Sequence, residues 1–347
     1  MSELPRVAVV VLNYNGAKIL PEFLPSVFNS TYPNLELVLA DNASTDESCD
    51  WVKENLPGFK IIRNEKNHGF AEGYHKILSQ IKGVDYYVLL NSDVEVTPNW
   101  IEPVIELMEK DASIAIAQPK ILSYLEKNKF EYAGAAGGYI DRFGYPFCKG
   151  RIFDTVEEDS LQYETNEQIF WASGAAMFIR ADVYEKSGGL DPDYFAHMEE
   201  IDLCWRVKNM GYKVYYCKDS TVYHLGGGTL HETNPYKTYL NFRNSLITLR
   251  KNLPLHISFG VLVIRHVLDF IQWLRFMFTG KFKHAFAINH AHYDFLITQA
   301  TWHSKRKKLI KLFKKPNKIG QYNRSIVFDY FVSGKKTFKK LDPKHFD

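Results

Sequence analysis

The fold of this chain is decided by the stretch Leu35-Glu36-Leu37-Val38-Leu39-Ala40-Asp41-Asn42, an apolar run that ends in a carboxylate and an amide. Two other short apolar runs end in the same way. Residues 7–12 are followed by Asn13, and residues 86–90 are followed by Asn91-Ser92-Asp93. Short apolar runs bounded by polar turn residues are typical of buried strands. In an open α/β sheet, ligands bind outside the carboxyl ends of the strands. We therefore expect these polar side chains to meet in one binding site.

The first third of the chain alternates strand and helix patterns. The sequence predicts strands at residues 7–12, 35–40, 60–63, 86–90 and 114–118, and helices at about 17–29, 46–55, 70–82 and 98–110. Thr97-Pro98 provides a start signal for the last of these helices. This alternation indicates a mostly parallel, doubly wound sheet, so the predicted fold class is α/β.

The pattern is less regular in the middle of the chain and then sharpens. Residues 119–170 contain several glycines, which indicate loops and short strands. The sequence then predicts a strand at 175–179, helices at 181–187 and 199–210, and short strands at 213–216 and 221–224. A long helical pattern covers 235–253, and a strongly apolar helix is predicted at 255–278.

Four motifs together resemble family 2 glycosyltransferases of the GT-A fold. They are listed in chain order: Val7-Ala8-Val9-Val10-Val11-Leu12-Asn13-Tyr14-Asn15-Gly16, Ala40-Asp41-Asn42-Ala43-Ser44-Thr45-Asp46, Asn67-His68-Gly69-Phe70-Ala71-Glu72-Gly73 and Leu90-Asn91-Ser92-Asp93. Within that family the chain is similar to bacterial rhamnosyltransferase-like members. The resemblance covers roughly residues 5–250, so we predict a GT-A domain at residues 1–253. It implies a nucleoside diphosphate sugar as the donor.

The resemblance places the nucleotide at the ends of the first two strands. It implies that Asp41 accepts a hydrogen bond from the imide N–H of uracil or thymine, which a carboxylate can do and which adenine cannot offer. The alternative role is that of a helix cap. Asn13 and Asn15 end the first strand and are expected to line the same pocket. Asp46 is assigned mostly to capping.

Further nucleotide-sugar contacts are expected from the next two motifs. Asn67, Gly69 and Gly73 open a helix, where glycine allows a close backbone approach and the helix N-terminus favours anions. An ordinary glycine-containing helix start is the alternative. Asn91 and Ser92 precede Asp93 in the position where many GT-A enzymes carry two aspartates.

The resemblance assigns a divalent metal ion to Asp93 and to His224, which lies in Val222-Tyr223-His224-Leu225-Gly226. Mg²⁺ often uses one or two carboxylates together with substrate phosphates, and a mixed oxygen and nitrogen set also suits Mn²⁺. The expected cofactor is therefore Mg²⁺ or Mn²⁺. The alternative for His224 is a buried structural histidine.

The catalytic base is expected in Glu199-Glu200-Ile201-Asp202-Leu203-Cys204-Trp205-Arg206, which resembles a family segment that usually has Asp where Glu200 stands. Glu200 is the first candidate and Glu199 the second. Neighbouring carboxylates raise each other's pKa, which suits a base near neutral pH. Asp202 and Arg206 are predicted to form a helix-surface pair. Residues 171–176 resemble the acceptor-side segment.

Arg243 lies in a helical segment that also resembles the family. Its guanidinium matches phosphate geometry and is expected to contact the diphosphate. A salt bridge within the protein is an equally good interpretation.

Charge and apolarity set the end of the chain apart. Residues 281–347 contain 16 Lys or Arg and four Asp or Glu, a net charge of +12, so the first 280 residues carry −9 of the total of +3. Residues 254–347 are therefore predicted to be a helical, amphipathic and basic region that associates with membrane. Arg265, Asp269, Gln272 and Arg275 form a polar stripe on its apolar helix, and the basic cluster includes Lys305, Arg306, Lys307, Lys308, Lys311, Lys314, Lys315 and Lys318. Packing on the catalytic domain, for the helix, and a solvated face, for the cluster, are the alternatives.

These patterns also bear on compartment and partners. The four cysteines are scattered and the N-terminus lacks a secretory pattern, so we expect a cytoplasmic protein, peripheral on the inner face of the cell membrane. The expected partners are a dTDP- or UDP-sugar, a glycan or lipid-linked acceptor and an anionic membrane surface, and not nucleic acid. The sequence leaves the oligomeric state open.

The function predicted from these features is an inverting, metal-dependent glycosyltransferase in cell-surface polysaccharide synthesis, with rhamnose as one possible sugar. A glycoside hydrolase with two carboxylates is a rival class, but it would not explain Asp41 or the helix-start motif. A catalytically degenerate scaffold on the same fold is the second rival.

Overall fold

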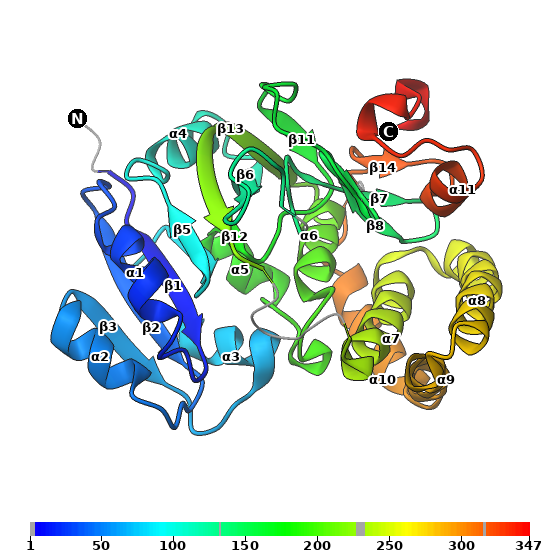
Figure 1. Cartoon of the computed structure of the whole chain (residues 1–347), viewed down its shortest axis with the longest axis horizontal. Helices are drawn as coiled ribbons and strands as arrows, with labels where there is room; N and C mark the ends of the chain where they lie inside the picture. Colours follow the sequence, from blue (N-terminus) through cyan, green and yellow to red (C-terminus); the bar gives the residue numbers. More distant parts are fainter. Residues whose placement is uncertain (1–3, 132, 227–232, 315–316) are drawn as a thin grey trace.

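Four parallel strands form the first half of the main sheet (Figure 1). The computed structural model describes residues 4–131, 133–226, 233–314 and 317–347. In it, the parallel strands are β1 (Val7–Asn13), β2 (Leu35–Asp41), β3 (Phe59–Arg63) and β4 (Tyr86–Asn91). Each is within one residue of the range that its apolar run predicts.

The second half of this sheet is mixed in direction. Its strands are β5 (Val94–Val96), β6 (Ile114–Ser123), β11 (Glu167–Ile169), β12 (Ala176–Arg180) and β13 (Lys213–His224). The strand order is β11-β13-β6-β12-β4-β1-β2-β3, and β5 pairs with β13. β12 lies antiparallel between β4 and β6. The sheet is therefore α/β as predicted, with antiparallel strands in one half.

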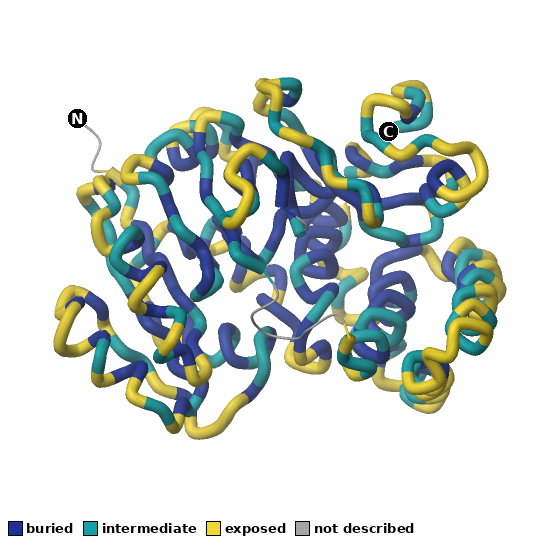
Figure 2. The backbone as a smooth tube through the Cα atoms, viewed as in Figure 1, coloured by how far each residue is buried: buried dark blue, intermediate teal, exposed yellow. Residues whose placement is uncertain are grey.

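Helices cover both faces of the sheet. They are α1 (Leu20–Phe28), α2 (Ser48–Asn55), α3 (Gly69–Leu78), α4 (Glu102–Lys110), α5 (Ala181–Ser187) and α6 (Glu199–Asn209). Side chains alternate along β1: Val9 packs in the core with α1, α2 and α4, whereas Val10 packs in the core with α3, α5 and α6. The buried layers on the two sides of the strands are visible in Figure 2.

Several predicted boundaries are wrong: β6 runs to Ser123 and not to residue 118, and α3 ends at Leu78 and not at residue 82. Helix α4 begins at Glu102 and not at Pro98, because residues 94–96 form β5 and the Thr97 hydroxyl donates to the Thr221 carbonyl at 3.0 Å. Residues 213–224 form one strand and not two, since β13 passes through an irregularity between Cys217 and Thr221 while it stays paired with β6.

The glycine-rich middle of the chain forms a second sheet. Its strands are β7 (Gly138–Asp141), β8 (Pro146–Cys148), β9 (Arg151–Ile152), β10 (Thr155–Val156) and β14 (Gln321–Tyr322). β14 pairs with β7 in parallel, and an oxygen of Asp141 accepts a hydrogen bond from the Ile326 amide at 3.0 Å. The end of the chain thus returns to a sheet built from residues 138–156. The predicted division at residues 253 and 254 stays a prediction.

The remaining helices follow the main sheet. They are α7 (Pro235–Asn252), α8 (Leu255–Phe278), α9 (Phe282–Ile297), α10 (Gln299–Ile310) and α11 (Ile326–Phe331), with short 3₁₀ turns at Pro192–Tyr194, Phe338–Lys340 and Pro343–His345. α7, α8 and α9 lie together at the end of the molecule away from α1 and α2 (Figure 1). All four cysteines are buried and free.

Candidate active site

The predicted site residues lie along one edge of the main sheet. The strand register places Asn13 beside Asp41, and Leu12 beside Asn91, so the carboxyl ends of β1, β2 and β4 meet. The Asn91 amide donates to the Ala175 carbonyl at 3.0 Å, which brings the segment before β12 to the same edge.

A polar cluster fixes the Asp41 carboxylate at this edge. Asn13 Nδ2 lies 3.0 Å from Asp41 Oδ1, and the Ser44 amide donates to Asp41 Oδ2 at 3.1 Å. Arg63, the last residue of β3, places its Nε 3.1 Å from the same Oδ2. Cys49 also hydrogen-bonds this carboxylate, and the Asp41 side chain is fully buried, so its predicted contact with a nucleotide base stays a prediction. Its register partner on β3 is Arg63, which the sequence analysis missed.

Asn15 shapes the turn beside this cluster. It has a positive φ of 53°, its amide donates to Ser44 Oγ at 2.9 Å, and its side-chain oxygen accepts from the Thr45 amide at 2.8 Å. Asp46 accepts from the Ala17 amide at 2.9 Å and from the Ser48 amide at 3.2 Å. Both residues thus join the loop after β1 to the loop after β2.

Asn42 connects the end of β2 to the start of α3, a role that the sequence analysis missed. Its Nδ2 donates to Asn67 Oδ1 at 3.0 Å and to the Gly69 carbonyl at 2.8 Å, and its Oδ1 accepts from the His68 amide at 3.2 Å. A side chain at Gly73 would place its Cβ 3.0 Å from Asn42 Nδ2.

The start of α3 is occupied by protein groups. The Phe195 carbonyl accepts from the amides of Phe70 at 2.8 Å and Ala71 at 3.1 Å. Gly69 has a φ of +71°, and a Cβ there would lie 2.5 Å from the Phe195 ring. The glycine is therefore required for a close approach to Phe195. Contacts of Asn67, Gly69 and Gly73 with a ligand stay predictions.

The predicted metal ligands are adjacent. His224 Nε2 lies 3.2 Å from Asp93 Oδ1 and 3.3 Å from Asn91 Nδ2, and His224 Nδ1 lies 3.4 Å from Glu131 Oε1. Ser92 is half-buried between Asn91 and Asp93. Glu131 was not identified from the sequence, because it follows the end of β6 in a stretch without a motif.

The pKa shifts of His224 and Asp93 favour a protonated His224 beside an ionised Asp93. Burial lowers the pKa of His224, but hydrogen bonds with Asp93 and Glu131 outweigh burial and raise that pKa to about 10. Burial likewise opposes ionisation of Asp93, and the contact with His224 outweighs it and lowers the pKa of the carboxyl.

The donor set fits a divalent ion in part. Two ligand atoms at right angles, each about 2.1 Å from an ion, are about 3 Å apart, and the 3.2 Å between His224 Nε2 and Asp93 Oδ1 matches that spacing. Within the described residues, no group of three His, Cys, Asp or Glu side chains is arranged as a metal site. Because a protonated imidazole cannot ligate a metal ion, the protein offers Asp93, and offers His224 only once the histidine has lost its Nε2 proton; donor phosphates and water would have to complete the shell.

Glu199 and Glu200 begin α6 beside the acceptor-side segment. A Cβ at Gly174 would lie 3.9 Å from Glu200 Cβ and 3.1 Å from the Phe70 ring. Burial raises the pKa of Glu200 to about 7, and burial together with the neighbouring Glu200 raises the pKa of Glu199 well above its usual range. One oxygen of each carboxyl is buried and finds no hydrogen-bond partner among the described residues. Glu200 can thus exchange a proton near neutral pH.

The loop before this pair has an unusual backbone. Phe195, His197 and Met198 have φ values of 64°, 68° and 72°. Such conformations cost energy in residues other than glycine and persist only where the surroundings hold them. This restrained loop leads directly into α6, so it fixes the position of the first helical turn and with it Glu200.

Asn244 of α7 provides this restraint. Its Nδ2 lies 3.0, 2.9 and 2.8 Å from the carbonyls of Tyr194, Ala196 and His197. Arg243 Nη2 donates to the Asp193 carbonyl at 2.6 Å, and its Nε donates to Asn244 Oδ1 at 2.9 Å. In this structure Arg243 thus supports the loop through hydrogen bonds, and its predicted contact with the diphosphate stays a prediction.

A buried ion network underlies α6. Asp202 and Arg206 do pair, with 2.8 Å between Arg206 Nε and Asp202 Oδ2, but the pair is buried and not on the helix surface as predicted. The reason is Lys251 of α7, whose Nζ lies 2.9 Å from Asp202 Oδ2 and 2.7 Å from Asp191 Oδ2. Lys305 of α10 pairs with Asp191 in turn.

We expect Lys251→Met to lower the free energy of unfolding by about 3 kcal/mol, because it removes a buried cation shared by Asp191 and Asp202, which then keep only Lys305 and Arg206 as charged partners. Urea denaturation followed by circular dichroism measures this loss. Lys53→Met is the matched control: its pair with Asp50 is exposed, so we expect a change of less than about 0.5 kcal/mol. Equal losses in the two variants would contradict the prediction.

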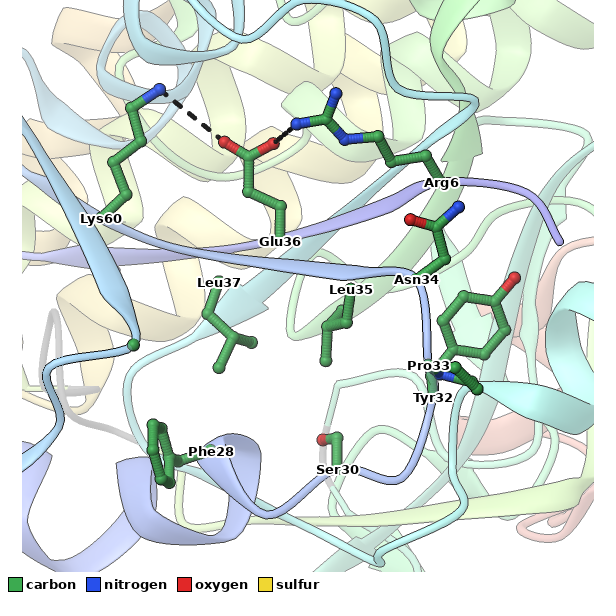
Figure 3. Close-up of a pocket in the computed structure, with 11 residues that line it drawn as sticks. Arg6, Phe28, Ser30, Tyr32, Pro33, Asn34, Leu35, Glu36, Leu37 and Lys60 are labelled. Atoms are coloured by element: carbon green, nitrogen blue, oxygen red, sulfur yellow. Dashed lines mark hydrogen bonds and ion pairs between the residues drawn. The ribbon is translucent and has the colours of Figure 1, made fainter. Parts of the chain in front are cut away.

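Two surface hollows differ in their relation to this edge. The first lies near the start of β2 and β3, where Glu36 forms ion pairs with Arg6 and Lys60 (Figure 3). That is the opposite end of the strands from Asp41, so it is a poor candidate site. The second, of about 450 Å³, is lined by Glu131 and Leu225 and therefore adjoins His224.

The architecture is shared with solved structures of the GT-A fold. A fragment of TarS from S. aureus in complex with UDP has a TM-score of 0.57 and 14% identity, covering 88% of each chain. The mannosyltransferase PcManGT from Pyrobaculum calidifontis, in complex with GDP-Man and Mn²⁺, has a TM-score of 0.51 and 14% identity, covering 90% of this chain and 86% of that one.

The chain belongs to Glycosyl transferase family 2, whose profile matches residues 8–187. An uncharacterized glycosyltransferase of Haemophilus influenzae is 25% identical over 286 residues, which cover 77% of this chain and 82% of the relative. An N-acetylglucosaminyl-diphospho-decaprenol L-rhamnosyltransferase of Mycobacterium tuberculosis is 23% identical over 233 residues, which cover 62% and 75%. The family and fold predicted from the motifs are thereby confirmed.

Proposed function

We propose that this protein is an inverting, metal-dependent glycosyltransferase that moves a sugar from a nucleoside diphosphate donor to a glycan or lipid-linked acceptor in cell-surface polysaccharide synthesis. The observation that carries the proposal is the arrangement of three groups beside one sheet edge. These groups are the fixed carboxylate Asp41, the pair Asp93 and His224, and the buried carboxyl of Glu200.

Glu200 is assigned the general base. With a pKa raised to about 7 by burial, it can take the proton of an acceptor hydroxyl at neutral pH. Gly174 lies beside it, and the Phe70 ring packs where a side chain at that position would stand, 3.1 Å from the Cβ. A single base and a single displacement at the anomeric carbon would invert its configuration.

Asp93 and His224 are assigned the binding of Mg²⁺ or Mn²⁺. A divalent ion bound there supplies positive charge to the diphosphate that leaves. The protein's own part is to orient Asp93 through His224, and His224 through Glu131.

The donor is proposed to be a dTDP- or UDP-sugar, with rhamnose as the first sugar to test because of the mycobacterial relative. That relative also motivates a lipid-linked acceptor and a site of action on the inner face of the cell membrane.

A degenerate scaffold on the same fold is the second candidate, and it is motivated by Asn91 and Glu200 in positions where relatives usually carry Asp. Isothermal titration with dTDP and UDP, with and without Mn²⁺, followed by a transfer assay, separates the two. Binding that Mn²⁺ strengthens, together with turnover, supports the enzyme. Binding without any turnover of dTDP- or UDP-sugars would support the scaffold.

We expect Asp41 to select pyrimidine donors, because a carboxylate can accept a hydrogen bond from an imide N–H, which adenine lacks. In competition assays UDP and dTDP are expected to bind at least about tenfold more tightly than ADP, as one buried hydrogen bond to a charged group contributes about 1.5–3 kcal/mol. Asp41→Asn is expected to reduce this preference. Equal competition by all three nucleotides would contradict the assignment.

A further inference from the structure

Helix α8 has the reverse of the polarity expected of a helix on a water-soluble surface. Its outer face consists of exposed apolar side chains: Leu255, Ile257, Phe259, Val263, Ile264, Val267, Phe270, Ile271 and Phe278. Ser258, Arg265 and Asp269 are its buried residues. The exposed strip along α8 is visible in Figure 2. Of the predicted polar stripe, Arg265 and Asp269 therefore face the protein, Gln272 is half-buried and Arg275 is exposed.

The buried charges hold α8 against the rest of the molecule. Arg265 Nη2 donates to Ser245 Oγ of α7 at 2.8 Å, and its Nη1 donates to the Phe143 carbonyl at 3.1 Å. Asp269 accepts from the Tyr145 hydroxyl at 3.1 Å and lies 3.1 Å from His292 of α9. These contacts orient the apolar face outward, because rotating the helix would break all of them.

The turn between α8 and α9 joins exposed aromatic and basic side chains. Phe278 is 86% exposed, Phe282 52% and Phe286 64%. Arg275, Lys281 and Lys283 are also exposed. The sequence contains no Asp or Glu from residue 270 to residue 293. We call these six residues the α8–α9 tip. An exposed apolar surface with a basic rim is complementary to the boundary between headgroups and acyl chains of anionic lipids.

We infer that the outer face of α8 and the α8–α9 tip form a membrane-binding surface that lies in one leaflet of an anionic bilayer. The inference deepens the proposed function, on which it rests for the idea of a lipid-linked acceptor. A second copy of the chain is a weaker occupant, because two tips of three cations each would repel.

The helix lies along the membrane and does not cross it. Among the described helices, α8 is the one long and apolar enough to span a bilayer. However, Arg265 and Asp269 bind α7, α9 and the β7–β8 turn, so a spanning α8 would pull these polar contacts into hydrocarbon. Asn244, next to Ser245 in α7, binds the loop before Glu200 and would have to follow.

The basic cluster predicted at residues 305–318 contributes less than expected. Lys305 pairs with Asp191 and with Asp193, the latter at 2.7 Å, and Arg306 is buried with its Nη1 2.7 Å from the Lys251 carbonyl. Both are structural. Lys307, Lys308, Lys311, Lys314 and Lys318 are exposed and remain available to anionic lipid, and Lys315 lies outside the described residues.

Liposome flotation of the full chain tests the inference. We expect binding to vesicles of phosphatidylglycerol and phosphatidylcholine and much weaker binding to phosphatidylcholine alone. Salt is expected to weaken binding, since the Debye length is only about 8 Å at physiological ionic strength.

Two variant proteins separate the apolar and basic contributions. Phe278→Ser with Phe282→Ser is expected to reduce partitioning at least about tenfold. Lys281→Gln with Lys283→Gln is expected to reduce it about fivefold per cation.

Matched controls use the same substitutions elsewhere. Leu125→Ser with Leu161→Ser removes two exposed apolar side chains, and Lys53→Gln with Lys110→Gln removes two exposed cations. These variants are expected to float like the unmodified protein.

Three outcomes would overturn the inference: no flotation under any condition, flotation unchanged in the tip variants, or a dimer in analytical ultracentrifugation that the Phe278 and Phe282 substitutions abolish. Nucleotide titration on the same samples keeps the two proposals apart. If the unmodified protein binds dTDP or UDP but does not float, the result counts against the membrane surface alone. Flotation without nucleotide binding counts against the proposed function alone.

Discussion

Replacing Glu200 with Gln is expected to slow sugar transfer by a factor of about 10²–10⁴ and to leave the Kd for dTDP or UDP unchanged, as is usual for loss of a general base. The amide has nearly the size of the carboxyl but cannot accept the acceptor's proton. Steady-state transfer assays and nucleotide titration measure the two quantities. Glu200→Asp, which restores the residue usual in the family, is expected to keep part of the activity.

Glu199→Gln is the matched control for this variant. Glu199 is the more deeply buried of the two, and burial together with the neighbouring Glu200 raises its pKa well above the usual range, which disfavours its ionised form. We expect this variant to retain transfer. A dead Glu199→Gln together with an active Glu200→Gln would move the base by one position.

The pH dependence follows from the same carboxyl. A base must be deprotonated to act, and burial raises the pKa of Glu200 to about 7. The value of kcat/KM is therefore expected to rise as pH increases through about 7 and to be lower below it. In Glu200→Gln this rise is expected to disappear. A flat profile in the unmodified protein would contradict the assignment.

Replacing Asp93 with Ala is expected to abolish the strengthening of nucleotide binding by Mn²⁺ or Mg²⁺. The variant loses the sole carboxylate of the Asn91-Ser92-Asp93 turn. Even side chains that only orient metal ligands typically contribute about 10–100-fold to metal affinity, so loss of a ligand is expected to cost at least about 100-fold. Titration of dTDP and UDP with and without Mn²⁺ measures the effect.

Asp93→Asn and Glu131→Gln complete this experiment. The asparagine keeps a hydrogen-bond acceptor beside His224 and guards against loss of folding, which circular dichroism checks. Glu131 touches only the far nitrogen of His224, at 3.4 Å, so its loss is expected to weaken metal binding less. Metal-dependent affinity that survives in both Asp93 variants would remove Asp93 from the site.

Much of the main sheet could be predicted because its strands can be recognised from their own apolar sequences. β1 and β4 are continuous apolar runs of six and five residues, β2 is an apolar run interrupted by Glu36, and all three end in a polar residue. The strands of the second sheet have two to four residues each, too few for a period. Moreover, β14 pairs with β7, whose residues lie more than 180 positions earlier in the chain.

In the candidate site, too, residues that lie in a local sequence pattern were predicted, and residues whose role depends on distant contacts were missed. Asp41 and Asp93 were found because they follow buried strands. Glu131 and Asn244 were missed, because their importance comes from contacts with His224 and with the loop before α6. The Asp202 and Arg206 pair was recognised from its spacing, but its burial depends on Lys251, about 50 positions away. Tertiary contacts of this kind leave no local pattern.

Two consecutive residues of α7 connect the loop before Glu200 to helix α8 and so fix the distance between them. Asn244 donates hydrogen bonds to the loop before Glu200, and Ser245 accepts a hydrogen bond from Arg265 of α8. If α8 lies in a leaflet, α7 sets the height of Glu200 above the headgroups, with no flexible linker to adjust it. A lipid-anchored acceptor would then react only when its terminal hydroxyl reaches that height. The number of sugars already on the lipid would thus become a criterion for selection, separate from the identity of the last one.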